Sequence, residues 1–138
     1  MGIVTTTITV TNHIDEILAE RGFIPVNQIR SITLDNVLVD TGATRLCLPA
    51  NIISDLGLPM MGEIQGETAI GNRMFRVFKD ATLAVAGREG LYNCVELPIG
   101  QEPLLGQIPL EDLGLEPDLM NQMLRVLPAE GKQSYIRV

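Results

Sequence analysis

Three apolar residues, Val37-Leu38-Val39, run directly into Asp40, and this junction constrains the fold of the chain more than any other feature. A continuous apolar run is typical of a strand that is buried on both faces. A carboxylate at the end of such a strand is costly unless a partner or a reaction uses its charge. Thr41 and Gly42 follow, and a small hydroxyl residue and a residue without Cβ allow a tight turn beside the carboxylate. We therefore expect Asp40 to lie on a loop at the floor of a cleft, where a catalytic aspartate could act.

The segment from Val37 to Ala43 resembles the active-site strand and loop of retropepsin-like aspartic proteases, in which apolar residues precede Asp-Thr/Ser-Gly-Ala/Ser. A second segment, Leu104-Leu105-Gly106, is similar to the apolar-apolar-glycine element that lies beside the active-site loop in that family. A short helix at Leu110 to Leu113 is expected to follow it, as the family pattern requires. The resemblance covers roughly Ile29 to Leu115, and both ends of the chain match only loosely.

The resemblance implies an all-β fold, namely a retropepsin-like acid-protease β-barrel subunit with one or two short helices that is assembled as a homodimer. We expect residues 1–138 to form one such domain, with its core at about 29–115. In retropepsin-like dimers the chain ends interleave in a sheet at the interface. By analogy, Ile3 to Val10 and Tyr135 to Val138 are the segments that would do so here.

The chain contains a single Asp-Thr-Gly, which is half of an aspartic protease site. That chemistry needs two carboxylates about 3 Å apart that share one proton and activate a water molecule. A homodimer supplies both, because a two-fold contact places Asp40 of one copy opposite Asp40 of the other. The resemblance then implies that Thr41 hydrogen-bonds across the interface, that Gly42 presents its carbonyl to the substrate backbone, and that Ala43 packs beneath the cleft. The expected activity is hydrolysis of an extended peptide or protein substrate.

Residues Glu63 to Val77 predict a β-hairpin with Gly71-Asn72 as its two-residue turn, since this pair tolerates positive φ between two extended runs. The resemblance implies that the hairpin is a flap, with Ile70, Gly71 and Asn72 lining the part that closes over a bound peptide. A glycine near the tip would allow the flap to open and close. A surface hairpin without such a role is the other interpretation, and it fits any β-rich fold.

Alternation of apolar and polar residues predicts further strands, and the Asp, Asn and Gly residues between them predict turns. The strands are expected at Ile3–Thr11, Gln28–Leu34, Thr82–Ala86, Leu91–Leu97 and Ser134–Val138. Asp35-Asn36 is predicted to form a tight turn. Gly87 to Gly90 is predicted to form another, with Arg88 and Glu89 at its tip.

Two helices are predicted besides the one that follows Gly106. One covers Asp15 to Arg21 and ends at Gly22, although a loop fits this segment nearly as well. The other covers Ala50 to Leu56 and ends at Gly57 in a left-handed cap.

One short segment occurs twice. Asp55-Leu56-Gly57-Leu58 recurs as Asp112-Leu113-Gly114-Leu115, and each copy follows one of the two motif segments. A fold with two related halves would contain such a repeat, although helices often end in Leu-Gly. Between the copies, Met60 and Met61 are expected to fill gaps in the core.

The composition argues against several kinds of partner. The chain has a net charge of −7 at pH 7 and no cluster of Lys or Arg, so neither nucleic acid nor an anionic membrane surface is expected to bind it. No apolar run approaches the ~20 residues that span a bilayer. The N-terminal residues do not resemble a secretory signal, and we therefore expect a cytoplasmic protein.

Cys47 and Cys94 are the only cysteines, and each has apolar neighbours. Buried reduced thiols are the expected state, because two cysteines without a secretory signal do not indicate a disulfide framework. Together with the single His13 they are too few for a zinc site. No metal and no cofactor is predicted.

Two other interpretations of the chain remain open. It could be a non-proteolytic dimerisation or peptide-binding module that keeps the retropepsin-like fold, with Asp40 accepting structural hydrogen bonds only. It could also be an unrelated β-rich domain in which Asp-Thr-Gly is an ordinary turn. Substrate preference does not transfer from the family, because Thr44 and Arg45 stand where viral members often carry aspartates. Arg45 is either a solvated charge or a group that attracts an acidic side chain of a substrate.

Overall fold

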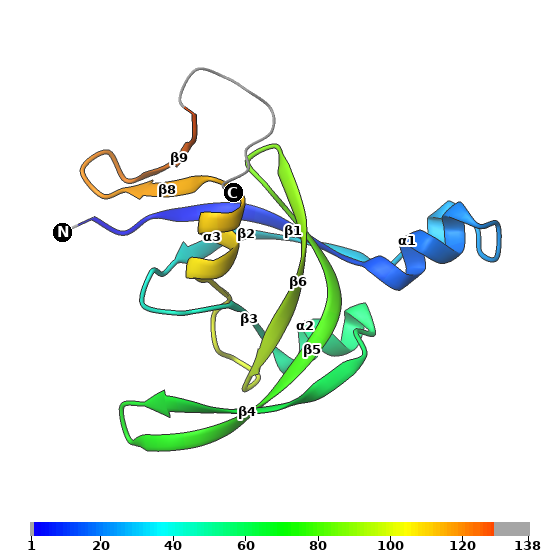
Figure 1. Cartoon of the computed structure of the whole chain (residues 1–138), viewed down its shortest axis with the longest axis horizontal. Helices are drawn as coiled ribbons and strands as arrows, with labels where there is room; N and C mark the ends of the chain where they lie inside the picture. Colours follow the sequence, from blue (N-terminus) through cyan, green and yellow to red (C-terminus); the bar gives the residue numbers. More distant parts are fainter. Residues whose placement is uncertain (1, 129–138) are drawn as a thin grey trace.

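The computed structural model describes residues 2–128, which form nine strands and three short α-helices (Figure 1). The protein is mostly β, as the sequence predicts, and its three helices are as many as the segment patterns predict, where the resemblance implies one or two. The strands are β1 (Thr5–Asn12), β2 (Ser31–Val39), β3 (Leu46–Pro49), β4 (Met60–Thr68), β5 (Gly71–Val85), β6 (Arg88–Leu97), β7 (Leu104–Leu105), β8 (Leu115–Asp118) and β9 (Met123–Val126). The helices are α1 (His13–Glu20), α2 (Ala50–Leu56) and α3 (Gln107–Asp112), with a 3-10 turn η1 at Val26–Gln28. No helix within residues 2–128 has the length and apolar character that a membrane span requires.

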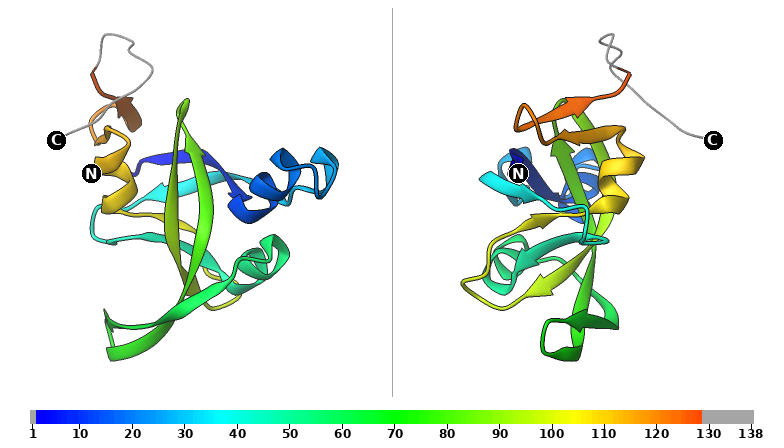
Figure 2. Two further views of the ribbon diagram at one scale, coloured as in Figure 1. Left: turned by 45° about the vertical axis from the view of Figure 1, so that its right-hand side comes forward. Right: turned by 90° about the vertical axis from the view of Figure 1, so that its left-hand side faces the viewer.

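The seven-stranded sheet closes on itself as a barrel, with the ring order β1-β2-β7-β3-β6-β5 and a further pairing of β5 with β1 (Figures 1 and 2). β4 pairs with β5 only and extends outside the ring. β2 and β3 follow each other in the chain, yet β7 lies between them, parallel to β2 and antiparallel to β3. The loop that joins β2 to β3, which begins at Asp40, is therefore placed beside the end of β7. β1 closes the ring although it lies outside the range that the resemblance covers.

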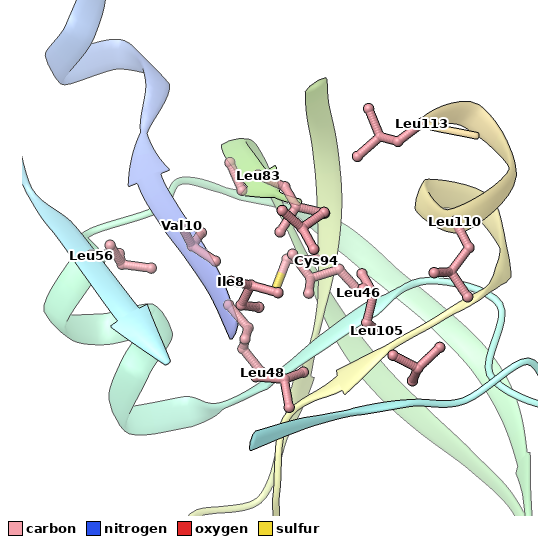
Figure 3. Packing of buried hydrophobic residues seen from close by; sticks show 14 of the residues in the cluster. Ile8, Val10, Leu46, Leu48, Leu56, Leu83, Cys94, Leu105, Leu110 and Leu113 are labelled. Atoms are coloured by element: carbon pink, nitrogen blue, oxygen red, sulfur yellow. The ribbon is translucent and has the colours of Figure 1, made fainter. Parts of the chain in front are cut away.

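Apolar side chains from all strands of the ring fill the barrel; they are mostly aliphatic, and β6 contributes Cys94. In β1, Ile8 and Val10 are buried in this core, while the hydroxyls of Thr9 and Thr33 lie 2.9 Å apart on the opposite face. This alternation explains why a strand rich in threonine can form one wall of an apolar core. α2 and α3 add apolar side chains to the same cluster, as Figure 3 shows for Leu56, Leu110 and Leu113.

The repeated Asp-Leu-Gly-Leu segments have equivalent structures. Each lies at the end of a helix, α2 or α3, and both Leu56 and Leu113 are buried. Gly57 and Gly114 follow with φ of 64° and 66°, the left-handed conformation that glycine adopts without steric cost. The predicted cap at Gly57 is confirmed.

Asp35 and Asn36 lie inside β2, so the predicted tight turn at this position is wrong. The register between β1 and β2 shifts here, and the two residues oppose the single Thr7 of β1 in a β-bulge. Asn36 has a φ of 58°, and the Thr7 hydroxyl donates a 3.0 Å hydrogen bond to Asp35 Oδ1. Asp and Asn suit a bulge for the same reason that they suit a turn, because both tolerate a left-handed backbone.

β5 is one continuous strand, whereas the sequence predicted a hairpin strand that ends at Val77 and a separate strand at Thr82–Ala86. The register between β5 and β6 shifts between Phe78 and Ala81, and Asp80 has a φ of 63°. A bulge therefore joins the two predicted strands. The first half of β5 pairs with β4, and the second half closes the barrel on β1.

The turn between β5 and β6 is Ala86-Gly87, shorter than predicted. Arg88 is the first residue of β6 and is 6% exposed, so its expected place at an exposed tip is wrong. Its Nη1 donates hydrogen bonds of 2.7 Å to Leu113 O and 3.2 Å to Gly114 O, at the C-terminal end of α3. The last carbonyls of a helix have no donor within the helix, and Arg88 supplies one for Leu113 O. Gly114 O also accepts a 2.8 Å hydrogen bond from the Leu127 N–H.

Other predictions concern the surface and the chain ends. Met60 and Met61 are exposed rather than in the core. Residues 5–11 pair with β2, whereas only residues 8–12 pair with β5. Within Ile3 to Val10, the residues before Ile8 therefore have no strand partner on the β5 side in the described part of the chain, and the place of this segment in an interface stays a prediction. The predicted strand at Ser134–Val138, with its interface segment Tyr135 to Val138, lies outside the described residues. The hairpin of β8 and β9 was not predicted.

Candidate active site

Asp40 directly follows the last residue of β2, and its backbone is tied to the neighbouring strand β7. The Asp40 N–H donates a 2.9 Å hydrogen bond to Leu105 O. Val39 is buried, whereas Asp40 is only half-buried. The apolar run thus anchors the strand in the core and leaves the carboxylate where the strand reaches the surface.

The carboxylate of Asp40 is oriented by its own loop. The Gly42 N–H donates a 2.9 Å hydrogen bond to Asp40 Oδ1, and the Ala43 N–H donates one of 3.1 Å to Asp40 O. A Cβ on Gly42 would lie 3.1 Å from the same Oδ1, so a side chain at this position would press on the carboxylate. Thr41, between them, is exposed. A backbone donor therefore fixes the position of one carboxylate oxygen.

Gly106 brings the segment Leu104-Leu105-Gly106 into contact with the Asp40 loop. A Cβ on Gly106 would lie 2.7 Å from Arg45 N and 2.8 Å from Ala43 O, and closer still to Arg45 O. All three neighbours are backbone atoms, so only a residue without a side chain permits this approach. The structure thus places the two motif segments of the sequence side by side.

α3 holds the same loop from its first turn. The N–H groups of Gln107 and Ile108 donate hydrogen bonds of 2.8 Å and 2.9 Å to the carbonyls of Ala43 and Thr44. A helix start leaves such donors without partners inside the helix, and here the loop supplies their acceptors. Local sequence gave no sign of these two bonds, because their partners lie far apart in the chain.

A small apolar cluster lies apart from the main core and joins the base of the β4–β5 hairpin to β3, β6 and β7. Its buried members are Cys47, Val77 and Val95, with Ile64, Phe75, Leu97 and Leu104 packed against them. Burial, and to a smaller extent the negative charge of Asp40, raise the pKa of the Cys47 thiol to about 11. Leu104 of this cluster pairs with Leu38 of β2, two residues before Asp40. The cluster therefore reaches the strand that carries Asp40.

The β4–β5 hairpin exists, but its turn is Ala69-Ile70 rather than the predicted Gly71-Asn72. Gly71 has a φ of 118° and is the first residue of β5, opposite Thr68. The Thr68 hydroxyl donates a 2.6 Å hydrogen bond to Gly71 O and accepts one of 3.3 Å from the Ile70 N–H. Ile70 is 98% exposed at the tip, and Gly71 and Asn72 are exposed beside it.

The hairpin extends from the barrel at the end where the loop after β2 lies (Figure 2). Among the described residues, the hydrogen bonds found at its tip are internal to the hairpin, and none joins it to Asp40. At its base, the Arg76 guanidinium makes two hydrogen bonds of 2.7 Å and 2.6 Å to the Glu96 carboxylate of β6. The hairpin is thus anchored at its base, no hydrogen bond within residues 2–128 joins its tip to Asp40, and its role as a flap stays a prediction.

The described residues offer no group of three or more His, Cys, Asp or Glu side chains that could hold a metal ion. Cys47 and Cys94 are free and buried, as the sequence predicts. Burial raises the pKa of the Cys94 thiol as well. His13 lies beside Glu16 and Thr82 at the start of α1, where its Nδ1 is 3.2 Å from Glu16 Oε1.

No family model matches the chain, and no curated protein matches it significantly. The chemistry of the site therefore rests on the residues around Asp40.

Proposed function

We propose that the chain is an aspartic endopeptidase of the retropepsin-like kind that is active as a homodimer. The observation that carries the proposal is the bracing of the Asp40 loop. Asp40 Oδ1 is held by the Gly42 N–H, and the loop is fixed against Gly106 and the first turn of α3. An ordinary turn after a strand needs no such second segment, whereas a catalytic carboxylate gains from being positioned before the substrate arrives.

In the proposed dimer each subunit contributes one Asp40 to a pair on the two-fold axis. Two carboxylates about 3 Å apart do not both ionise, so one is charged and the other keeps a proton. The charged member takes a proton from a water molecule between them, and that water attacks the carbonyl carbon of the peptide bond. The protonated member donates a hydrogen bond to the carbonyl oxygen. Proton transfer to the amide nitrogen then releases the amine.

The neighbouring residues bind the substrate and join the subunits. Thr41 bonds across the interface, the Gly42 carbonyl accepts a hydrogen bond from the substrate backbone, and Ala43 packs beneath the cleft. An extended peptide lies in the cleft as an added strand. The β4–β5 hairpin closes over it, with Ile70, Gly71 and Asn72 at its tip.

The proposed partners are a second copy of the chain and an extended peptide or protein. Neither nucleic acid nor a membrane is proposed, because the net charge of −7 opposes both kinds of anionic surface. The proposed compartment is the cytoplasm, where the two buried cysteines stay reduced without a disulfide.

The test is cleavage of an unfolded protein or a peptide library by the purified chain. We expect cleavage that is lost in Asp40→Asn, blocked by a statine-type inhibitor and bell-shaped in pH, since a carboxylate pair must hold one proton. Asp55→Asn is the matched control, because Asp55 is an exposed carboxylate on α2 outside the Asp40 loop. Cleavage that survives Asp40→Asn refutes the proposal. Peptide binding without cleavage identifies a non-proteolytic binding module instead.

A further inference from the structure

A small cavity lies where the Asp40 loop meets β3, β6 and the first turn of α3. Its volume is about 200 Å³, and Arg45, the last residue before β3, forms part of its wall. Asn93 of β6 and Ile108 of α3 line it from the other sides. The Ile108 N–H donates a 2.9 Å hydrogen bond to Thr44 O, so the cavity is built onto the loop that carries Asp40. We refer to it as the Arg45 pocket.

Arg45 is a half-buried cation, and its side chain has no hydrogen bond, ion pair or ring contact with the part of the chain that the structure describes. Arg30, Arg76 and Arg125 are exposed, yet each of them pairs with a carboxylate. A guanidinium that has lost part of its hydration gains most from an anionic acceptor. Arg45 is therefore available to bind an anion from outside the chain.

A second donor lines the same pocket. Asn93 is half-buried, and its side-chain amide, which carries two N–H donors, makes no hydrogen bond within residues 2–128. The Tyr92 hydroxyl, also at the wall, is already bonded to the Asp112 carboxylate of α3. Among the described residues that line the pocket there is no carboxylate. The pocket thus offers a positive charge and an amide donor without an anion of its own.

The remaining walls and the size of the pocket indicate what can fill it. Leu91 and Ile108 are 52% and 44% exposed at its walls, and Leu46 is fully buried and points into the main core (Figure 3). Apolar walls accept methylene groups and strengthen an ion pair beside them, because they lower the local dielectric constant. Pockets for whole small molecules span about 300–1,000 Å³. A pocket of about 200 Å³ suits one side chain of a larger ligand.

We propose that the Arg45 pocket binds an acidic side chain, Asp or Glu, of the peptide substrate and so sets the sequence preference for cleavage. The inference rests on the proposed function, and it selects the second of the two interpretations of Arg45 that the sequence left open. The Arg45 guanidinium pairs with the substrate carboxylate, and the Asn93 amide donates a further hydrogen bond to it. The methylene groups of the substrate side chain lie against Leu91 and Ile108.

The position of Arg45 in the chain limits where the acidic residue lies in the substrate. Arg45 follows Asp40 by five residues, so their backbones are at most about 18 Å apart. An extended substrate advances about 3.3 Å per residue, which places the acidic residue within about five residues of the cleaved bond. The two-fold axis of the proposed homodimer repeats the pocket. The preference should therefore occur twice, at equal distances before and after the cleaved bond.

The net charge of −7 opposes an acidic substrate at long range but not inside the pocket. Like charges slow the encounter of protein and peptide. Salt at 0.15 M screens exposed charges that are more than about 8 Å apart, whereas a partly buried pair in contact is screened much less. The preference for an acidic side chain should therefore persist at physiological ionic strength.

Cleavage of a peptide library at 0.15 M salt tests the proposal, because it shows whether Asp and Glu are enriched at two symmetric positions. Three peptides with Glu, Gln or Lys at the preferred position then give kcat/KM. Wild type should favour Glu over Gln by about tenfold, as one charge-assisted contact at a half-exposed site predicts. Arg45→Gln should bring this ratio close to one, Arg45→Lys should keep part of it, and Arg45→Glu should favour the Lys peptide.

Arg21→Gln is the matched control and should keep the ratio of about tenfold. Arg21 is exposed and directly follows α1, at the opposite end of the molecule from the loop after β2 (Figure 1). The ratio compares two peptides on one variant, so a general loss of stability or activity cancels. Thermal unfolding of each variant shows whether it is folded, and Arg45→Lys and Arg45→Glu give the result if Arg45→Gln does not fold.

Fluorescence anisotropy of the same peptides with Asp40→Asn separates this inference from the proposed function, because it measures binding without cleavage. Cleavage without an acidic preference, or a preference that survives in Arg45→Gln and Arg45→Glu, overturns the inference and leaves the proposed function standing. A preference that Arg21→Gln reduces as much as the Arg45 variants also overturns it. Tighter binding of the Glu peptide than of the Gln peptide, with no cleavage by wild type, supports the pocket and refutes the protease. An absence of both cleavage and binding refutes both proposals.

Discussion

Gly106→Ala is the substitution that most directly probes the bracing of the Asp40 loop. Its Cβ would meet only backbone atoms, among them Arg45 N at 2.7 Å and Ala43 O at 2.8 Å, so no side chain can move aside to make room. Overpacking of this kind costs about 1–3 kcal/mol. Separating the two backbones would also weaken the hydrogen bonds from Gln107 and Ile108 to the loop, each worth about 1 kcal/mol. We expect the free energy of unfolding to fall by about 2–4 kcal/mol.

Thermal unfolding followed by circular dichroism measures this loss. An unfolding entropy of roughly 2.1 cal/mol/K per residue converts it into a fall in Tm of about 7–14 °C for 138 residues. Gly62→Ala is the matched control, because a Cβ on this β4 residue would meet nothing within 4 Å and its φ is not positive. Its Tm should stay within about 2 °C of wild type. If the Gly106 and Gly62 variants unfold alike, the close approach of the two segments does not hold the loop.

Two further predictions concern titratable groups. Hydrogen bonds from Arg30 hold the pKa of the buried Asp15 carboxyl below its ordinary value, against the opposing effect of burial. The stability from this pair is present above about pH 4 and is lost as the pH falls through the folded-state pKa of Asp15. The Tm of Asp15→Asn should therefore fall less steeply than that of wild type as the pH is lowered. An identical slope in wild type and Asp15→Asn would contradict this prediction. Because the pKa of Cys47 is about 11, its thiolate fraction near pH 8 is about a thousandth. Both cysteines should therefore resist a thiol reagent in the native protein and react fully in denaturant, and fast native labelling of Cys47 would show that its burial is overstated.

Local patterns in the sequence are sufficient to predict the elements whose structure depends on near neighbours in the chain. The alternation of Thr with Ile and Val defines β1, because one face of that strand is buried and the other is not. Val37 to Val39 defines the end of β2, and Gly57 defines the end of α2 through its left-handed backbone. These features follow from side-chain period and backbone sterics alone.

Elements that depend on distant partners could not be predicted in this way. Asp35-Asn36 suits a turn and a bulge equally, and pairing with β1 decides for the bulge. The bulge at Asp80 keeps β5 continuous because β6 pairs with β5 on both sides of the bulge. Arg88 is buried because it donates a hydrogen bond to Leu113 O, and this acceptor lies 25 residues further along the chain, beyond the reach of any local pattern. In each case the competing local structures are close in energy, and tertiary contacts select between them.

In the candidate site, too, features set by near neighbours could be predicted from the sequence, whereas contacts between distant segments could not. The hydrogen bond from the Gly42 N–H to Asp40 is local, and a tight turn at this position is readable from the sequence. Gly71 has the positive φ that the sequence predicts, but the turn lies two residues earlier than predicted, because the Thr68 hydroxyl braces Ala69-Ile70. The contact of Gly106 with the loop was anticipated only through the resemblance, since no local pattern links residues so far apart.

The central claim is that Asp40 of two copies forms one shared site, and mixing wild type with Asp40→Asn at fixed total concentration tests it most directly. If each site needs both carboxylates and the chains pair at random, cleavage falls as the square of the wild-type fraction, to about one quarter in an equal mixture. A linear fall, to about one half in the same mixture, would mean that each chain carries its own site and would contradict the account.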